Sequence, residues 1–220
     1  MLFLVLANIS RSLVETIFKR RVEMIGKRSL VYGAGINDWD GNVLVDGKEI
    51  KEYTLWRGVL QRCFSEEHKQ KYPTYQGVTC SKDWLLMTNF VKDVSKMKGY
   101  GLEGWDLDKD ILQKGSKLYS KETCCFVPHE INLLLTKRDN YRGEWPVGVS
   151  FDKHAGKFRA QLSLNGKRKF LGYFTTAEEA FQAYKLAKEA NIKVVAEKWK
   201  HQLDERVYQA LLAYEVNIDD

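Results

Sequence analysis

The stretch that decides the fold is GVSFDKHAGKFRAQLSLNGKRKFLGYFTTAEEAFQAYKLAK, residues 148–188. Three runs, at 147–151, 157–164 and 169–174, alternate or nearly alternate between apolar and polar residues, which is typical of strands. The pair Asn165-Gly166 between the second and third runs indicates a tight hairpin. Thr176 and Glu179 have the spacing of a capping box before a helix. We therefore expect a three-stranded antiparallel sheet packed on one helix.

The two faces of the expected middle strand differ in chemistry, because neighbouring side chains point to opposite sides of a sheet. One face carries Phe158, Ala160 and Leu162, and the other carries Arg159, Gln161 and Ser163. Small and aromatic residues line one side of the following helix, so it is expected to cover the apolar face. The open face is then basic and polar, which favours a nucleic-acid reader.

Positive charge is concentrated on this segment and the residues before it. Residues 137–200 hold 14 lysines and arginines against seven acidic residues, whereas 201–220 hold one against five. A clustered basic surface attracts polyanions and steers their association. The alternative interpretation is an ordinary solvated basic face.

Side-chain chemistry on the open face matches groups that DNA presents. Arg168 can bond guanine through two hydrogen bonds, Gln161 can bond adenine, and Phe170 can contact a thymine methyl group. Other basic residues suit phosphates, which provide affinity without sequence information. These residues are Lys153, Lys157, Arg159 and Lys167.

The segment from Gly148 to about Lys188 resembles the ethylene-response-factor (Apetala-type) DNA-binding domain. The resemblance is carried by GV at 148–149, GKF at 156–158, LGYF at 171–174, TAEEA at 176–180 and AY at 183–184. It implies that the sheet, rather than the helix, lies in the major groove of double-stranded DNA. The positions matching the family's DNA contacts are Ser150, Gln161, Ser163, Arg168 and Phe170. Several family contacts are Arg, Glu or Trp where this chain has Ser, Gln and Phe, so the family's target sequence does not carry over.

Upstream of this segment the patterns predict helices and then a short mixed motif. Apolar residues at helical spacing predict helices over 53–64 and 81–97. Strands are expected over 105–112 and 123–127, followed by a helix with Pro128 in its first turn, where its missing N–H costs nothing. The local order is strand, turn, strand, helix.

An ordered series of residues in 31–136 resembles a group of bacteriophage-type proteins that look like degenerate His-Asn-His (HNH) homing endonucleases, often with a C-terminal Apetala-type domain. The series is Trp56-Arg57, Arg62-Cys63, Val78-Thr79-Cys80, Trp84, Phe90, Leu107-Asp108-Lys109, Tyr119-Ser120, Thr123-Cys124 and Asn132. The resemblance implies a ββα-metal-like nuclease domain with added helices. Such a domain hydrolyses a phosphodiester with Mg²⁺ or Mn²⁺.

Carried over by position, Asp108 and Asn132 would bind the metal ion. Asp110 offers a second carboxylate that would share a strand face with Asp108, and oxygen ligands of this kind suit Mg²⁺ or Mn²⁺. The alternative is that Asp108 and Asp110 only flank a turn.

Catalytic roles would fall on Asp108, Lys109, Thr123 and His129. Lys109 stands where the general-base histidine belongs, and an ordinary lysine is cationic and accepts no proton at pH 7. Thr123 replaces the asparagine that orients the base. His129 lies one helical turn before Asn132 and could reach the same site, or it is a surface residue of the helix.

The cysteines are Cys63, Cys80, Cys124 and Cys125, and they form no CxxC pair. With no secretory signal, this pattern favours a reduced protein of the cytoplasm, the host cell's if the chain is phage-encoded. A structural Zn²⁺ would need a further ligand such as Cys125 or His68, and the spacings are not those of a zinc knuckle. Buried free thiols are the expectation.

The two resemblances, together with the composition of the segments between and around them, imply five parts. They are an N-terminal extension at 1–30, the HNH-like domain at 31–136, a linker at 137–146, the Apetala-type domain at 147–192, and an amphipathic helix with an acidic tail at 193–220. The extension is either a short amphipathic helix or lies upstream of a natural start at Met24, and its apolar run is too short to cross a membrane. Apolar residues every four positions predict a helix from Val194 to Val216 that packs on the chain or forms a homodimer.

The expected fold class is therefore α+β. The expected function is sequence-preferring DNA binding of the HNH homing-endonuclease type. The alternative is a catalytically inactive DNA-binding regulator or inhibitor derived from such a nuclease. A third hypothesis is a protein-interaction module whose basic sheet faces an acidic partner.

Overall fold

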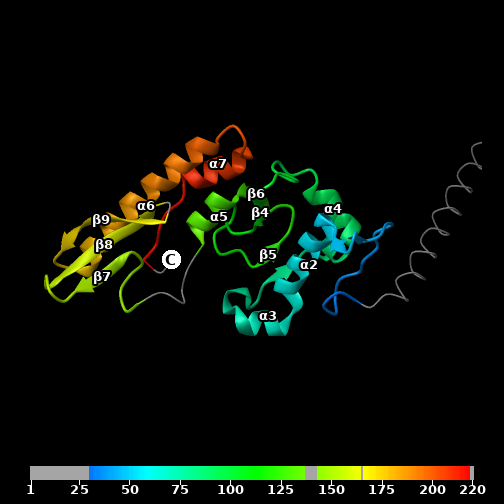
Figure 1. Ribbon diagram of the computed structural model, residues 1–220, viewed down its shortest axis with the longest axis horizontal. Coiled ribbons are helices and arrows are strands. Elements are labelled where there is room, and N and C mark those ends of the chain that lie inside the picture. Colours follow the sequence, from blue (N-terminus) through cyan, green and yellow to red (C-terminus); the bar gives the residue numbers. More distant parts are fainter. Residues whose placement is uncertain (1–29, 137–142, 165, 219–220) are drawn as a thin grey trace, which may run out of the picture. The chain divides into compact units, whose positions relative to one another are not determined.

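The computed structural model describes residues 30–136, 143–164 and 166–218, and it confirms the expected α+β class (Figure 1). Among these residues, one compact unit takes in 30–100 and 113–124, and a second takes in 101–112 and 125–218. This division differs from the expected domain boundary in 137–146, because the strand-strand-helix motif belongs to the second unit. The expected extension at 1–30, except Leu30, and most of the expected linker lie outside the described residues.

The first unit is mainly helical. Its elements are β1 (Leu44–Val45), β2 (Lys48–Glu49), α2 (Lys51–Phe64), α3 (Glu66–Lys71), η1 (Pro73–Tyr75), β3 (Thr79–Cys80), η2 (Lys82–Leu85), α4 (Met87–Val94) and β5 (Leu118–Tyr119). The helical stripe expected in 53–64 is confirmed, since Trp56, Val59 and Leu60 are fully buried. The single helix expected over 81–97 is instead a 3₁₀ turn followed by α4. The Trp56 indole N–H donates to the carbonyl of Trp84 at 2.8 Å and ties α2 to this region.

The second unit begins with the strand-strand-helix motif. Strand β4 (Trp105–Asp108) pairs antiparallel with β6 (Cys125–Pro128), and α5 (His129–Leu135) follows. The expected order is confirmed, but both expected strand ranges are corrected. Strand β4 ends at Asp108 because its carboxylate accepts the backbone N–H groups of Asp110 and Ile111 and turns the chain. Pro128 closes β6 and precedes the helix.

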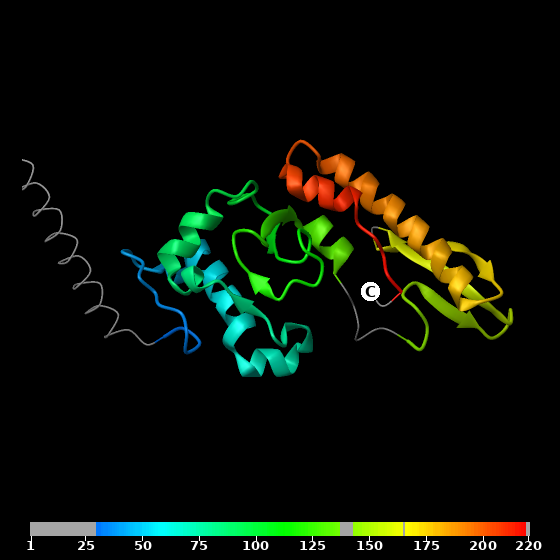
Figure 2. The same ribbon diagram turned by 180° about the vertical axis from the view of Figure 1, so that it is seen from behind.

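The three-stranded sheet has the expected order and pairing. It consists of β7 (Val149–Asp152), β8 (Lys157–Leu164) and β9 (Lys167–Phe174), all antiparallel, with β8 in the middle. Helix α6 (Ala177–Trp199) lies against one face of this sheet (Figures 1 and 2). The capping box is confirmed, since the Thr176 hydroxyl accepts the Glu179 N–H at 3.2 Å and the Glu179 carboxylate accepts the Thr176 N–H.

The single helix expected from Val194 to Val216 is wrong. Helix α6 ends at Trp199, the chain turns, and a separate helix α7 (Glu205–Leu212) follows beside α6 (Figure 1). The Asp204 side chain caps α7 by accepting the backbone N–H of Arg206 at 2.9 Å. Although α6 has 23 residues, neither it nor any other helix in the described ranges is long and apolar enough to cross a bilayer.

Candidate nucleic-acid interface

The inner face of the sheet is a closely packed core. Ala160 and Leu162 on β8 are buried with Phe181 and Tyr184 of α6. Gly148, just before β7, has a φ of +78°, and a Cβ atom there would lie 2.0 Å from Cδ2 of Tyr184. No larger residue fits this position without displacing the tyrosine ring, so the sheet is held tightly on its helix.

The register of the strands places all five family-matched positions on the other, open face. Residues paired across strands share a face, and Ala160 of β8 points inward. The open face therefore has three successive rows across the strands. They are Ser150–Arg159–Tyr173, Gln161–Phe170 and Ser163–Arg168.

A β-bulge changes which residues of β9 face outward. Ala160 pairs with Gly172, but Gln161 pairs with Phe170, so Leu171 is an extra residue in β9. Gly172 has a φ of +141°, and a Cβ atom there would be only 3.2 Å from the Phe174 ring. A bulge shifts the alternation of side chains by one residue. Phe170 and Tyr173, which lie on either side of the bulge and three positions apart, are therefore on the same face.

Tyr173 is the residue that this bulge adds to the open face, and strict alternation in the sequence did not identify it. Its ring lies 5.1 Å from that of Phe170 in an edge-to-face arrangement. Phe170 is 52% exposed and Tyr173 is 45% exposed. The signal available in the sequence was Gly172, because a glycine inside a strand often marks a bulge.

An acidic residue, Asp152, also lies on this face and was not expected there. Its carboxylate accepts the backbone N–H groups of His154 and Ala155 and the hydroxyl of Tyr173, the last at 2.9 Å. The pKa of Asp152 is lowered, first by the Ala155 N–H and then by the Tyr173 hydroxyl. The pKa of Tyr173 is raised because its hydroxyl donates to this carboxylate.

The basic residues of the open face are exposed or half-exposed. Arg159 is half-buried, and its Nε donates to the Ser150 hydroxyl at 3.4 Å. Lys157 lies at the start of β8, and Lys153 lies in the loop before it. Lys167 pairs with Leu164 and therefore lies on the side of α6 rather than on the open face.

The expected metal ligands make hydrogen bonds and ion pairs within the chain. One carboxylate oxygen of Asp108 accepts two backbone N–H groups at 2.7 and 2.8 Å, and burial raises the pKa of this group. Asp110 lies beyond the end of β4, so the expectation that it shares a strand face with Asp108 is wrong. Both Asp110 carboxylate oxygens bind the Lys109 ammonium at 2.8 Å. Within the described ranges, no group of three His, Cys, Asp or Glu side chains is arranged to hold a metal ion.

The two residues expected to replace the catalytic histidine and asparagine have local roles. Lys109 is buried, with 7% of its surface exposed, and pairs with Asp110. Thr123 is also buried, and its hydroxyl donates to the carbonyl of Leu118 at 2.6 Å. Thr123 belongs to the first compact unit, whereas Lys109 belongs to the second.

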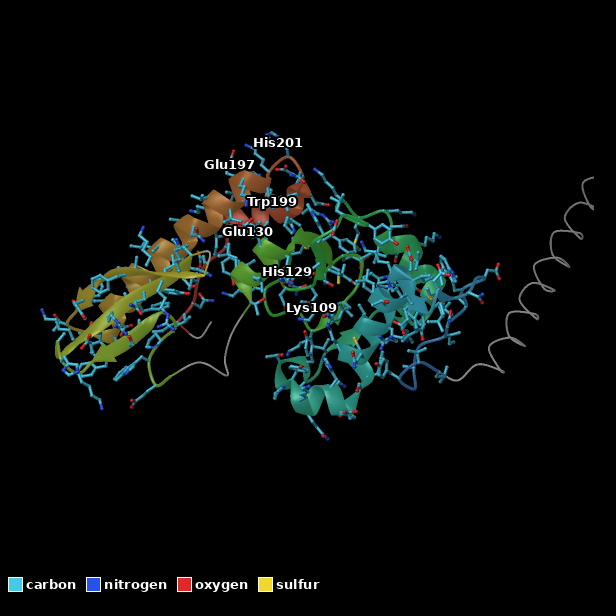
Figure 3. All side chains as sticks on the ribbon, viewed as in Figure 1. Lys109, His129, Glu130, Glu197, Trp199 and His201 are labelled. Atoms are coloured by element: carbon cyan, nitrogen blue, oxygen red, sulfur yellow. The ribbon has the colours of Figure 1, made fainter. Side chains whose placement is uncertain are left out.

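A different cluster of polar side chains forms on the motif. The carboxylate of Asp106 lies 2.6 Å from His129 Nδ1 and accepts the Asn132 amide N–H at 2.9 Å. Figure 3 labels His129 at the start of α5. The sequence predicted His129 and Asn132 on one side of a helix, but it placed both in a site with Asp108 rather than with Asp106. Asp106 was missed because the resemblance gives its position no role.

The four cysteines form no disulfide bond. Cys63, Cys124 and Cys125 are buried as expected, whereas Cys80 is only half-buried. The thiols of Cys63 and Cys80 hydrogen-bond, and this contact raises the pKa of Cys63 and lowers that of Cys80. His68 packs against the rings of Tyr72 and Tyr75.

Comparison with known proteins found no family model, curated protein or solved structure that matches the chain.

Proposed function

We propose that the protein binds double-stranded DNA with sequence preference through the open face of its three-stranded sheet. The observation that carries this proposal is the strand register, which gathers Ser150, Gln161, Ser163, Arg168 and Phe170 on one surface. Because α6 covers the opposite face, the sheet is a rigid platform from which these side chains project.

The chemistry of the surface supports DNA rather than an acidic protein as the partner. Arg168 is exposed and can form two hydrogen bonds with guanine, and Gln161 can form two with adenine. Such planar, paired hydrogen bonds match base edges. Lys153, Lys157 and Arg159 are suited to phosphates, which set position and affinity.

A second candidate function is phosphodiester hydrolysis with a divalent metal ion, as the HNH resemblance implies. The cluster of Asp106, His129 and Asn132 is the observation that favours it, because a carboxylate can orient an imidazole for proton transfer. However, one oxygen of Asp108 accepts two backbone N–H groups and both oxygens of Asp110 bind the Lys109 ammonium, so these carboxylates have partners within the chain. These contacts favour the alternative of a catalytically inactive regulator or inhibitor that binds DNA.

Two further expectations remain proposals. We propose that the protein acts in the cytoplasm, with which its reduced cysteines agree. Dimerisation through the C-terminal region would have to use residues other than Val207 and Leu211, because both are buried within the second unit.

Binding is tested with the full chain and fluorescent duplexes at several NaCl concentrations. We expect duplex binding that weakens with salt, and we expect Arg168→Ala to lose about 1–3 kcal/mol of binding free energy for the preferred sequence. Leu186→Ala is the control, because Leu186 on α6 is 68% exposed and lies outside the open face. Duplex binding that is absent or independent of salt would contradict the proposal.

Cleavage is tested separately by incubating plasmid DNA with Mg²⁺ or Mn²⁺ and the full chain. Asp108→Ala and His129→Ala variants are assayed beside it. Cleavage that either substitution abolishes would establish the nuclease, and binding without cleavage would leave the regulator.

A further inference from the structure

The bulge in β9 creates an apolar pair on an otherwise polar surface. Phe170 and Tyr173 are three residues apart, yet both point away from α6, with ring centroids 5.1 Å apart and planes at 64°. About half of the surface of each residue is exposed. The Tyr173 hydroxyl donates to the Asp152 carboxylate at 2.9 Å, which favours this orientation of the ring. This pair is a built feature of the surface rather than two scattered aromatic residues.

The pair's neighbours indicate what it contacts. Gln161 lies directly across from Phe170 in the same row, and Arg159 lies across from Tyr173. The major groove presents one apolar group, the C5-methyl of thymine, and the adenine paired with that thymine is the base a glutamine recognises best. One row of the sheet thus carries complementary groups for both bases of an A·T pair.

We infer that the Phe170–Tyr173 pair recognises thymine methyl groups, so that the preferred DNA site contains A·T pairs about two base pairs from the guanine contacted by Arg168. This inference rests on the proposed function. Successive rows lie two residues apart along a strand, about 6.6–6.8 Å. Base pairs rise about 3.4 Å each, so a strand running along the groove advances about two base pairs per row.

Stacking on unpaired bases is the competing use of exposed aromatic rings. The edge-to-face arrangement disfavours it, because the edge of one ring covers part of the face of the other. Two successive bases would need two open ring faces, whereas methyl groups need only an apolar surface.

The test first obtains a preferred duplex by selection from a random library with the full chain. Every thymine in that duplex is then replaced by deoxyuridine, which removes the methyl groups and leaves base pairing unchanged. We expect the wild-type protein to lose affinity by about four-fold for each methyl group contacted, corresponding to about 0.8 kcal/mol per buried carbon. This comparison changes only the DNA, so its outcome does not depend on whether a variant protein folds.

Variants then assign the effect to the two rings. Phe170→Ala and Tyr173→Ala are expected to bind the thymine duplex more weakly and to lose most of the discrimination against uracil. Arg168→Ala is expected to bind weakly but to keep the thymine-to-uracil ratio. Phe151→Ala is the matched aromatic control, because Phe151 pairs with Phe158 on the other face of the sheet and is 43% exposed. It is expected to leave both affinity and ratio unchanged.

Three outcomes would overturn the inference while leaving DNA binding intact. The first is equal affinity for the thymine and uracil duplexes. The second is tighter binding of single strands than of the duplex. The third is that a duplex in which G·5-methylcytosine replaces the A·T pair binds as tightly as the thymine duplex. The last would show that any C5-methyl suffices and that Gln161 contacts no adenine. Absence of salt-dependent binding to every duplex would instead overturn the proposed function itself.

Discussion

At position 148 the backbone φ is +78°, and a Cβ atom would lie 2.0 Å from the Tyr184 ring. Gly148→Ala is therefore expected to lower the free energy of unfolding by about 3 kcal/mol, since it combines backbone strain with overpacking. Gly156→Ala is the matched control, because Gly156 has a φ of +61° and a Cβ atom there would have no neighbour within 4 Å. It is expected to cost about 1 kcal/mol. Urea denaturation followed by circular dichroism measures both, and equal losses would contradict the steric explanation.

Asp108 provides a prediction that depends on pH. Burial raises its pKa, so the folded state holds this proton more tightly than the unfolded chain does. The stabilising contribution of the protonated form is present below the ordinary aspartate pKa of about 3.9 and is lost as the pH rises through the folded pKa. Asp108→Asn, which keeps an acceptor for the two backbone N–H groups, is expected to raise stability at pH 7.

The advantage of Asp108→Asn should shrink as the pH falls through the raised pKa of folded Asp108, and it should be absent below about 3.9, where both proteins are neutral at this position. Denaturant midpoints measured from pH 3 to pH 8 check this. A constant difference across that range would indicate that desolvation of the carboxylate is not its cause. Asp110→Asn is the parallel substitution, at a half-exposed carboxylate that binds the Lys109 ammonium.

Residues whose partners are close in sequence were predicted better than those whose partners are distant. Thr176 and Glu179 are three positions apart, and their capping box followed from the sequence. Asp106 contacts His129 and Asn132 across 23 and 26 positions. Nothing local to Asp106 indicates that contact, so the sequence pointed to Asp108, whose carboxylate instead closes a tight turn.

The start of α6 depends on its capping box, which satisfies backbone N–H groups that the helix cannot. Thr176→Ala is expected to lower the free energy of unfolding by about 1 kcal/mol. Thr175→Ala makes the same chemical change one residue earlier, where the side chain does not accept the Glu179 N–H, and should have little effect. Thermal denaturation of the two variants distinguishes a capping role from a general effect of removing a threonine.

Helix α5 is tied to the end of α6 by Glu130. Its carboxylate accepts the Lys198 ammonium at 2.5 Å and the Trp199 indole N–H at 2.8 Å (Figure 3 labels Glu130 and Trp199). The Lys198 contact is the main reason why the pKa of Glu130 is lowered. Glu130→Gln is expected to cost less than about 1 kcal/mol, because solvent screens this partly exposed ion pair.

The loss from Glu130→Gln should be present at neutral pH and disappear as the pH falls through the pKa of Glu130. The reason is that the Lys198 contact stabilises only the ionised form of the Glu130 carboxylate, and this preference is what lowers its pKa. Urea midpoints at pH 7 and pH 3 measure this, with Lys198→Met as the partner in a double-mutant cycle. Additive losses from the two substitutions would exclude a direct interaction.

Local patterns gave most of the helices and strands but not their limits. The Asn165-Gly166 pair and the alternating runs fixed the three-stranded sheet, because hairpin and strand signals are local. The apolar repeat that includes Val195, Leu203 and Val207 predicted one long helix, yet the chain turns after Trp199. All three residues are still buried, so the pattern predicted burial correctly, but it did not predict the turn after Trp199 or the new helix that Asp204 caps.

For the complete chain, net charge and its placement predict how binding depends on salt. Each lysine that neutralises one phosphate adds about 0.9 to the slope of log affinity against log salt concentration. Lys153→Ala and Lys157→Ala are therefore each expected to reduce that slope by about 1 and to weaken all duplexes alike. Lys193→Ala on α6 is the control, because it removes the same charge away from the open face. An unchanged slope in the first two variants would place the phosphate contacts elsewhere.

The interleaving of the two compact units limits how this protein can be taken apart. The chain passes from one unit to the other after Tyr100, Leu112 and Cys124, so neither unit is one continuous piece of sequence. A fragment beginning at the sheet would lack β4, β6 and α5. Trp199 would then lose its contacts with Trp105 and Glu130. The sheet with α6 is therefore not expected to fold as an independent domain. Transferring it to another protein would require residues 101–112 and 125–136 as well.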